Sequence, residues 1–503
     1  MKKAPLLILA GIASMAAACT QTPVTSPANS TVTAEATQPN LSLISADELR
    51  EDLFTLSSDE MRGKRAGTED ELRAAAWVAE QARAAGLEPA GDDGTYFQFF
   101  PIKRTKVTDN STVAINGKPL ILWKNTWVTS PAEINVNAPV VWLNSLADTA
   151  RQNLQGKVVA MTLQAPSPLP AQGMSLWNYR YVASALRQQT NALKNQKAAA
   201  IILVTDKEAE SDFGFIGHVF EEGTYQLEGE AARQNTNAPV LLVHSSVAPA
   251  LKQKNAKLKA DIGVDSFVYP SANVVARAPG SDPSLKDEHV LFSGHHDHDG
   301  IGAVVDGDSI YNGADDNATV TVALIAIGKA WVQQPGKRSG LFVWHGAEER
   351  GLLGSRWYVE HPTVPKESIV AVLNADMIGR NAPDSAALLG SIPPHRNSTE
   401  LVDMALNANQ EFTKFSLDTS WDEASHPEGW YFRSDHLPYA RAGIPAIFFT
   451  TLLHPDYHTP RDEAEFIDIE KLTRMTRWMY ATGWAVSETM KRPATDPDAK
   501  LER

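Results

Sequence analysis

The feature that most constrains the fold is an alternation of short apolar runs and longer helix-like segments that begins at about residue 272. The strand-like runs cover residues 288–294, 339–345, 369–375 and 444–451. The segments with helical periodicity cover residues 317–334, 351–361, 398–412 and 469–488. Strands that alternate with helices are typical of a sheet covered by helices on both faces. The sequence therefore predicts an α/β fold for this part of the chain.

Each of the four apolar runs leads into side chains that commonly bind metal ions. The residues that follow them are His295, His296, Asp297 and His298; His345, Glu348 and Glu349; Asp376; and His454, Asp456 and His458. Asp315 and Asp316 stand just before the helix-like segment 317–334. Because sites in open α/β sheets form at the carboxyl ends of the strands, we expect these side chains to converge. Any one of them alone would more often be an ordinary surface residue, so the inference depends on their coincidence.

The chemical types of these side chains restrict the metal. Imidazoles and carboxylates without a thiolate suit zinc, and also manganese or cobalt. Three carboxylates and one hydroxide together neutralise two divalent ions. Two such ions, about 3.5–4 Å apart, can share one carboxylate and one hydroxide, as in many hydrolases. The sequence therefore favours a two-metal hydrolytic centre.

Five motifs then occur in a characteristic order: SGHHDHDG, NGADDNA, HGAEERGLLGS, LNADMIG and PDYHTPRDE. This series resembles the co-catalytic zinc peptidase family that includes bacterial leucyl aminopeptidase, glutamate carboxypeptidase and transferrin receptor. The resemblance is strongest over residues 270–490, and residues 56–81 resemble the family's N-terminal part. It implies the three-layer α/β/α fold of a zinc exopeptidase (phosphorylase/hydrolase-like) and an aminopeptidase activity on peptides.

The resemblance also implies a ligand set for two zinc ions, namely His295, Asp316, Glu349, Asp376 and His458. His295 and Asp376 would bind one ion, and Glu349 and His458 would bind the other. Asp316 would bridge the two ions.

Further roles follow from the same resemblance. Glu348 would be the general base that takes a proton from the bridging water, and Asp297 would orient His295. Tyr431 and Met377 would contact the substrate. Other histidines crowd the motifs: His296, His298, His345 and His454. The spacing nevertheless favours His295 and His458 as the ligands.

The N-terminus carries an export signal. Lys2 and Lys3 precede an apolar stretch, Leu6 to Met15, that is too short to span a bilayer as a stable helix. Three alanines and the sole cysteine, Cys19, follow. This segment resembles the bacterial lipoprotein signal, in which the cysteine is lipidated; the alternative is a plain secretory signal. We therefore expect an exported protein, anchored through Cys19 in the bacterial cell envelope, in the outer membrane facing the periplasm.

The rest of the chain differs in composition from the motif-bearing part. Residues 105 to about 270 contain short β-rich runs punctuated by Pro and Gly, which predicts a mostly β module without chemistry of its own. This module is similar to the protease-associated domain often inserted in the family. The predicted organisation is a signal peptide (1–19), a flexible tether (20–40), the first part of the peptidase domain (41–104), the inserted module (105–270), the zinc peptidase domain (271–492) and a tail (493–503).

These observations favour a zinc-dependent aminopeptidase that cleaves peptides with a hydroxide shared by two zinc ions. The alternatives are a carboxypeptidase or glutaminyl cyclase of the same fold, and a non-catalytic surface binding lipoprotein. The net charge of −14 argues against a nucleic acid as partner. The sequence leaves the oligomeric state open.

Overall fold

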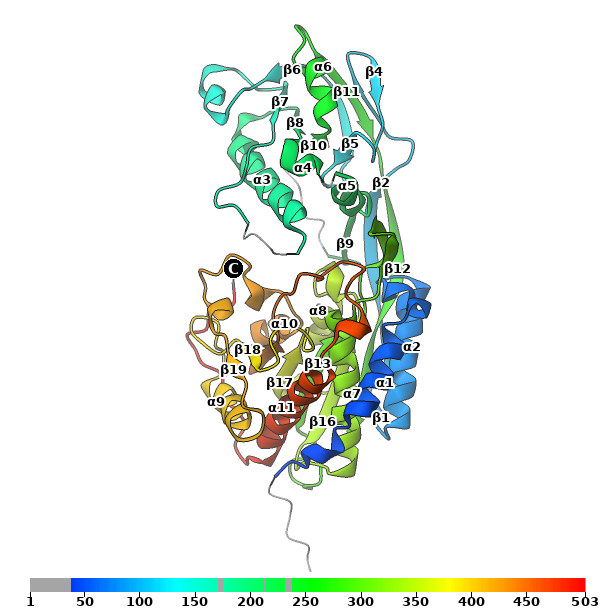
Figure 1. Ribbon diagram of the computed structural model, residues 1–503, viewed down its shortest axis with the longest axis vertical. Helices are drawn as coiled ribbons and strands as arrows, with labels where there is room; N and C mark the ends of the chain where they lie inside the picture. The colour runs from blue at the N-terminus through cyan, green and yellow to red at the C-terminus, as the bar shows by residue number, and fades with distance from the viewer. Residues whose placement is uncertain (1–37, 171–174, 212, 231–237, 503) are drawn as a thin grey trace, which may run out of the picture. The chain divides into compact units, whose positions relative to one another are not determined.

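The computed structural model of the protein describes residues 38–170, 175–211, 213–230 and 238–502. Within these residues the main sheet has ten strands, and four neighbouring strands run parallel (Figure 1). In order across the sheet they are β20 (Ala446–Thr450), β17 (Ile369–Ala375), β13 (His289–His295) and β16 (Ser339–His345). These four strands coincide with the four apolar runs, which confirms the predicted α/β fold.

Further strands extend the parallel group on both sides. They are β18 (Ser385–Leu389) and β19 (Ser416–Leu417) beyond β20, and β12 (Val264–Ala278), β2 (Phe97–Val107), β9 (Thr224–Leu227) and β1 (Glu88–Pro89) beyond β16. β12 pairs antiparallel with β16 on one edge and with β2 on the other. The sheet is therefore parallel where its carboxyl ends carry the predicted ligands and mixed towards its edges.

Side chains on successive residues of the central strands face opposite layers of helices. In β13, Val290 and Phe292 join one buried apolar cluster, whereas Leu291 joins another on the opposite face. The first cluster packs against α1 (Ala46–Leu56), α2 (Glu69–Ala84), α7 (Thr319–Gln333), α9 (Thr399–Ala408) and α11 (Ile469–Glu488), and the second against α8 (Leu353–Glu360) and α10 (His436–Arg441). This period-two division of the strands produces three layers.

The local sequence explains where these helices begin. The hydroxyl of Ser45 accepts a hydrogen bond from the Glu48 amide and so caps α1. Helix α7 starts at Thr319, two residues later than predicted, because Ala314–Ala318 form a single π-helical turn. The amides of Asp315 and Asp316 in that turn donate to the buried Asp462 carboxylate. These hydrogen bonds fix the main chain of the turn at Asp315 and Asp316.

A second sheet of eight strands is formed by residues between β2 and β12. Its strands are β3 (Thr112–Ile115), β4 (Lys118–Leu120), β5 (Thr126–Val128), β6 (Ile134–Trp142), β7 (Val158–Thr162), β8 (Ala200–Val204), β10 (Val240–Val243) and β11 (Lys257–Ile262). Its helices are α3 (Trp177–Leu193), α4 (Lys207–Glu210), α5 (Phe213–Glu221) and α6 (Ala248–Leu251). We call residues 108–263 the inserted segment. The predicted domain boundaries, and the kinship to a protease-associated domain, stay predictions.

The chain leaves the main sheet along β2 and returns along β12. These two strands pair antiparallel from Phe97 opposite Val274 to Val107 opposite Val264. The inserted segment is thus connected to the main sheet through two adjacent strands, and its own strand β9 pairs antiparallel with β2 at the edge of that sheet.

The predicted export signal with Cys19, and most of the predicted tether, lie outside the described residues. Among the residues that are described, no helix combines the length and the apolar character needed to cross a bilayer.

Candidate metal centre

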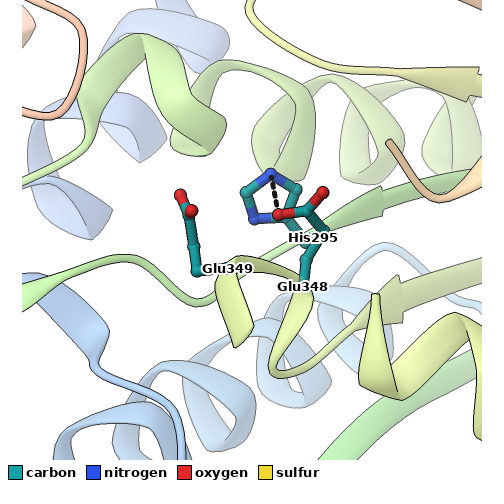
Figure 2. A group of neighbouring side chains, drawn as sticks. All are labelled: His295, Glu348 and Glu349. Carbon is teal, nitrogen blue, oxygen red and sulfur yellow. Dashed lines mark ion pairs between the residues drawn. The ribbon is translucent and has the colours of Figure 1, made fainter. Parts of the chain in front are cut away.

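The predicted site residues meet at the carboxyl edge of the main sheet. His295 is the last residue of β13, and Asp376 follows β17 directly. Glu348 and Glu349 lie in a short 3₁₀ turn after β16, and His458 lies in the loop after β20. Figure 2 shows both of these carboxylates and the His295 ring facing the same space. The convergence expected from the strand ends is therefore present.

Asp316 lies between the two histidines of the cluster. Its Oδ1 atom is 3.3 Å from Nε2 of His295, and its Oδ2 atom is 3.2 Å from Nε2 of His458. Asp376 Oδ1 approaches the same nitrogen of His295 at 3.6 Å, and Glu349 Oε2 approaches Nε2 of His458 at 3.3 Å. The five side chains thus form two groups that share one carboxylate.

Several buried atoms of this cluster have no hydrogen-bond partner among the described residues. They include Nε2 of His295, Nε2 of His298, Nε2 of His458 and Oδ1 of Asp376. Buried polar atoms without partners are rare in folded proteins, and each needs an explanation. His295, Asp316 and Asp376 offer ligand atoms within 4.8 Å of one another, as do His298, Asp316 and Glu349. Imidazole and carboxylate groups at such spacing fit a divalent cation such as zinc.

The charges of the cluster depend on one another. Burial by itself would raise the pKa of Asp316, but contacts with His295 and His458 hold it well below its usual range. For His295, the carboxylates of Glu348 and Asp376 outweigh burial and raise the pKa. The shared carboxylate is therefore stabilised as an anion between two histidines.

Asp297 supports the turn that carries the two glutamates. Its Oδ1 atom accepts a hydrogen bond of 2.9 Å from the Glu348 amide, and its Oδ2 atom accepts one of 3.3 Å from the Glu349 amide. Nδ1 of His295 lies 3.2 Å from the Asp297 carbonyl oxygen and 3.8 Å from its carboxylate. The predicted contact with His295 is therefore made mainly by the main chain of Asp297, and the Asp297 carboxylate holds the main chain at Glu348 and Glu349.

Glu348 lies beside His295, with Oε2 at 3.8 Å from Nε2 of that histidine (Figure 2). Burial raises the pKa of Glu348 well above its usual range, and the adjacent Glu349 adds to this effect. A carboxylate with a raised pKa is a stronger base than an exposed one, which suits proton transfer near neutral pH.

The backbone beside these residues is strained at three positions that are not glycine. Ala347, just before Glu348, has a φ of 53°, Met377, just after Asp376, has 57°, and His458 itself has 52°. Left-handed backbone of this kind is uncommon outside glycine and clusters at functional sites. Tertiary contacts therefore override the backbone preference of these residues and fix the direction of the neighbouring site side chains.

The other histidines of the motifs are placed differently. Nε2 of His345 is 3.2 Å from the Tyr439 hydroxyl, and its Nδ1 is 3.2 Å from Asn273 Oδ1. Both ring nitrogens of His345 thus have partners outside the cluster. Nε2 of His454 lies 3.5 Å from Asp315 Oδ2, and its Nδ1 accepts a hydrogen bond of 3.3 Å from the Asp456 amide. By contrast, Nδ1 of His298 is 2.9 Å from Oε1 of Glu349. His298 is thus a member of the cluster that spacing alone had set aside.

The two residues expected to contact the substrate are both fully buried. Tyr431 stacks on the His395 ring at a centroid distance of 4.4 Å, and burial raises its pKa. Met377 belongs to the same apolar cluster as Tyr431. Neither side chain has surface open to a peptide in this conformation, so their assignment to the substrate site stays a prediction without structural support.

Sequence reasoning missed the residues behind His458. Nδ1 of His458 is 2.8 Å from Oδ2 of Asp299, and Asp299 is 3.3 Å from Nη2 of Arg350. A signal for Asp299 is present, because the motif SGHHDHDG places carboxylates two and four residues after His295. No pattern in the sequence indicates its pairing with His458.

Comparison with known proteins supports this fold. Residues 273–483 match the family pattern described as Peptidase family M28. Leupeptin-inactivating enzyme 1 of Streptomyces exfoliatus is 32% identical over 174 residues, which cover 34% of this chain and 34% of that protein. Aminopeptidase YwaD of Bacillus subtilis is 28% identical over 195 residues, which cover 36% of this chain and 40% of that protein. The chain thus spans less than half the length of these two relatives.

Solved structures extend the likeness to nearly the whole chain. An aminopeptidase from Aneurinibacillus sp. strain AM-1 covers 92% of this chain, and 97% of its own, with a TM-score of 0.56 at 18% identity. BSAP, a zinc aminopeptidase from Bacillus subtilis, covers 91% of this chain, and 99% of its own, with a TM-score of 0.57 at 20% identity. At this identity the likeness shows a shared fold. The part of the chain that matches peptidase family M28, residues 273–483, is the part that carries the cluster.

Proposed function

We propose that the protein is a metallo-aminopeptidase that uses two zinc ions to remove the N-terminal residue from peptides. The observation that carries this proposal is the position of Asp316, whose two oxygens face different histidines at 3.3 Å and 3.2 Å. A carboxylate shared in this way is what a two-metal hydrolase requires. His295 and Asp376 would hold one ion, and His458 and Glu349 the other. Manganese or cobalt would suit the same ligands.

Zinc bound at such a site supplies a water of lowered pKa, about 7 in known enzymes, and polarises the scissile carbonyl. Glu348 would accept a proton from the attacking water and pass it to the leaving amine. Its burial and its nearness to His295 suit this role. Asp297 keeps Glu348 in position by accepting hydrogen bonds from the Glu348 and Glu349 amides.

The names of similar proteins support an exopeptidase that starts at the N-terminus, since aminopeptidases recur among them. The experiment compares peptides that have a free N-terminus with the same peptides acetylated, and identifies the amino acid released. Release of the N-terminal residue from free peptides alone is expected. Release of the C-terminal residue, or no release at all, would contradict the proposal.

The same assay tests the base. Glu348→Gln preserves the size of the side chain but removes its basicity, so turnover should fall by about 100- to 10,000-fold. The zinc content, measured by atomic emission, should stay close to that of the wild type. Glu367→Gln, at an exposed glutamate of the same domain, is the matched control and should behave like the wild type. Activity retained in Glu348→Gln would exclude this residue as the base.

We also propose that the mature protein is held in the bacterial envelope by a lipid on Cys19. The basic, apolar and small-residue stretches of residues 1–19 support this. Cys19→Ala should lose fatty-acid labelling, whereas labelling that persists in the variant would exclude Cys19 as the acceptor.

A further inference from the structure

Both ring nitrogens of His458 contact carboxylates. Its Nε2 atom faces the cluster, at 3.2 Å from Asp316 and 3.3 Å from Glu349. Its Nδ1 atom faces away from those two carboxylates and lies 2.8 Å from Oδ2 of Asp299. A proton on Nδ1 donated to Asp299 leaves the lone pair of Nε2 free to bind a cation.

Asp299 is itself the end of a chain of alternating charges. It lies 3.3 Å from Nη2 of Arg350, whose Nη1 atom lies 3.4 Å from Oε2 of Glu222. The other oxygen of Glu222 is 2.9 Å from Nη2 of Arg65. These side chains are 11–23% exposed, so they are shielded from water much better than ordinary surface ion pairs.

Glu222 does not belong to the central sheet or to its helices. It follows α5 directly and lies in the inserted segment. Arg350, by contrast, ends the 3₁₀ turn that carries Glu348 and Glu349. The Arg350 guanidinium also stacks over the ring of Tyr225, another residue of the inserted segment, at 5.3 Å. The inserted segment therefore contacts the centre through a defined set of side chains.

We propose that Asp299 is a positioning residue for His458, and that Glu222 of the inserted segment supports it through Arg350. The inserted segment then contributes to the affinity of the outer zinc position, the one formed by His458 and Glu349. This inference rests on the proposed two-zinc function. Partners of metal-bound histidines typically change metal affinity by about 10- to 100-fold when they are replaced.

The test measures zinc binding by the full chain, after its metal has been removed, in competition with a chelating dye. Wild type should bind two ions with separable affinities. In Asp299→Asn one of the two affinities should fall by about 10- to 100-fold, and the other should change less than about twofold. Asp299→Ala, which cannot accept a hydrogen bond at all, should lose more than Asp299→Asn.

Glu222→Gln tests the contribution of the inserted segment. It should weaken the same zinc position by a smaller factor, about 3- to 10-fold, because Asp299 itself remains. Glu221→Gln, at the exposed neighbouring residue, is the matched control and should leave both affinities unchanged. The double variant Asp299→Asn/Glu222→Gln should be no weaker than Asp299→Asn alone, because both changes act on one ligand.

Each result has a distinct meaning. If wild type bound fewer than two zinc ions, the proposed function itself would fail. If wild type bound two but Asp299→Asn bound them equally tightly, the positioning role alone would be wrong. Complete loss of one ion in Asp299→Asn would make Asp299 a ligand and overturn its role as a positioning residue. Activity that recovers in Asp299→Asn at raised free zinc would support that role, since a folding defect would not respond in that way.

Discussion

The two halves of the centre are built in different ways. The inner half, His295 with Asp376, lies at strand ends, and these side chains are 1% and 8% exposed. The outer half, His458 with Glu349, comes from a loop and a short turn, and the His458 side chain is 18% exposed. The same chemistry of imidazole plus carboxylate is thus supported by a sheet on one side and by loops on the other.

The carboxylates of Asp297 and Asp299, which lie next to the two halves, are also held in different ways. Asp297 is held by main-chain amides of the turn that follows β16. Asp299 is held by the long side chain of Arg350, which in turn depends on Glu222. Amides of a short turn have little freedom to lose, whereas long charged side chains lose considerable rotamer entropy when they are ordered. Because the His295 side chain is also far less exposed than that of His458, we expect the inner half to bind metal more tightly than the outer half.

The largest expected effect comes from the residue that both halves share. Asp316→Ala removes the carboxylate between His295 and His458 and leaves the remaining charges without a bridge. Activity should fall by at least about 1,000-fold, equivalent to several kcal/mol of transition-state stabilisation. Zinc analysis should show at most one ion per chain.

Asp287→Ala, at an exposed aspartate before β13, is the control and should retain both ions. If Asp316→Ala kept two ions and near-normal activity, the two halves would be independent sites rather than one shared centre.

A smaller effect separates the halves directly. During titration with a chelator, one zinc ion should leave at a chelator concentration about tenfold lower than the other, because the outer half is less rigidly supported. Metal analysis of samples along the titration, together with activity, would follow both ions. Simultaneous loss of the two ions at every concentration would contradict a difference in affinity between the halves.

A further expected effect lies outside the centre, at the opposite end of β13, and separates the acid sensitivity of the fold from that of the centre. Burial, with a contribution from Arg277, lowers the pKa of His289 to about 4. The unfolded chain takes up this proton below about pH 6.5, but the folded chain only below about pH 4. Stability should thus fall as the pH drops through this window, by up to about 3 kcal/mol.

Denaturant unfolding of the metal-free protein at pH 7 and pH 5 would measure this effect. His289→Gln should show a flatter dependence on pH than the wild type. His361→Gln, at an exposed histidine, should not. An unchanged slope in His289→Gln would place the acid sensitivity elsewhere.

Much of the sheet and the inner half could be predicted because strong local patterns specify them. The runs 339–345 and 369–375 became β16 and β17 with the same bounds, and 469–488 became α11. Long segments with a regular hydrophobic period bury one face in almost any context, so their secondary structure can be predicted from the sequence. Ligands at the ends of such strands then follow from the sheet itself.

The parts that could not be predicted depend on contacts between distant loops. The pairing of Asp299 with His458, and of Arg350 with Glu222, joins residues whose separation in sequence carries no periodic signal. The late start of α7 depends on hydrogen bonds to Asp462, far along the chain. The burial of Tyr431 depends on a stack with His395 that composition does not reveal.

The paired strands β2 and β12 have a consequence for how this protein could change over time. Val107 and Val264 are direct partners in an antiparallel pair, so their Cα atoms are separated by only about 5 Å. A tight hairpin turn would therefore suffice to close the chain if everything between them were deleted. Such a shortened descendant would lose only β9 from the rim of the main sheet. It would also leave Arg65 and Arg350 without their partner Glu222. A protein that lost the inserted segment would therefore need another anionic side chain at this position, or would bind the second metal ion less tightly.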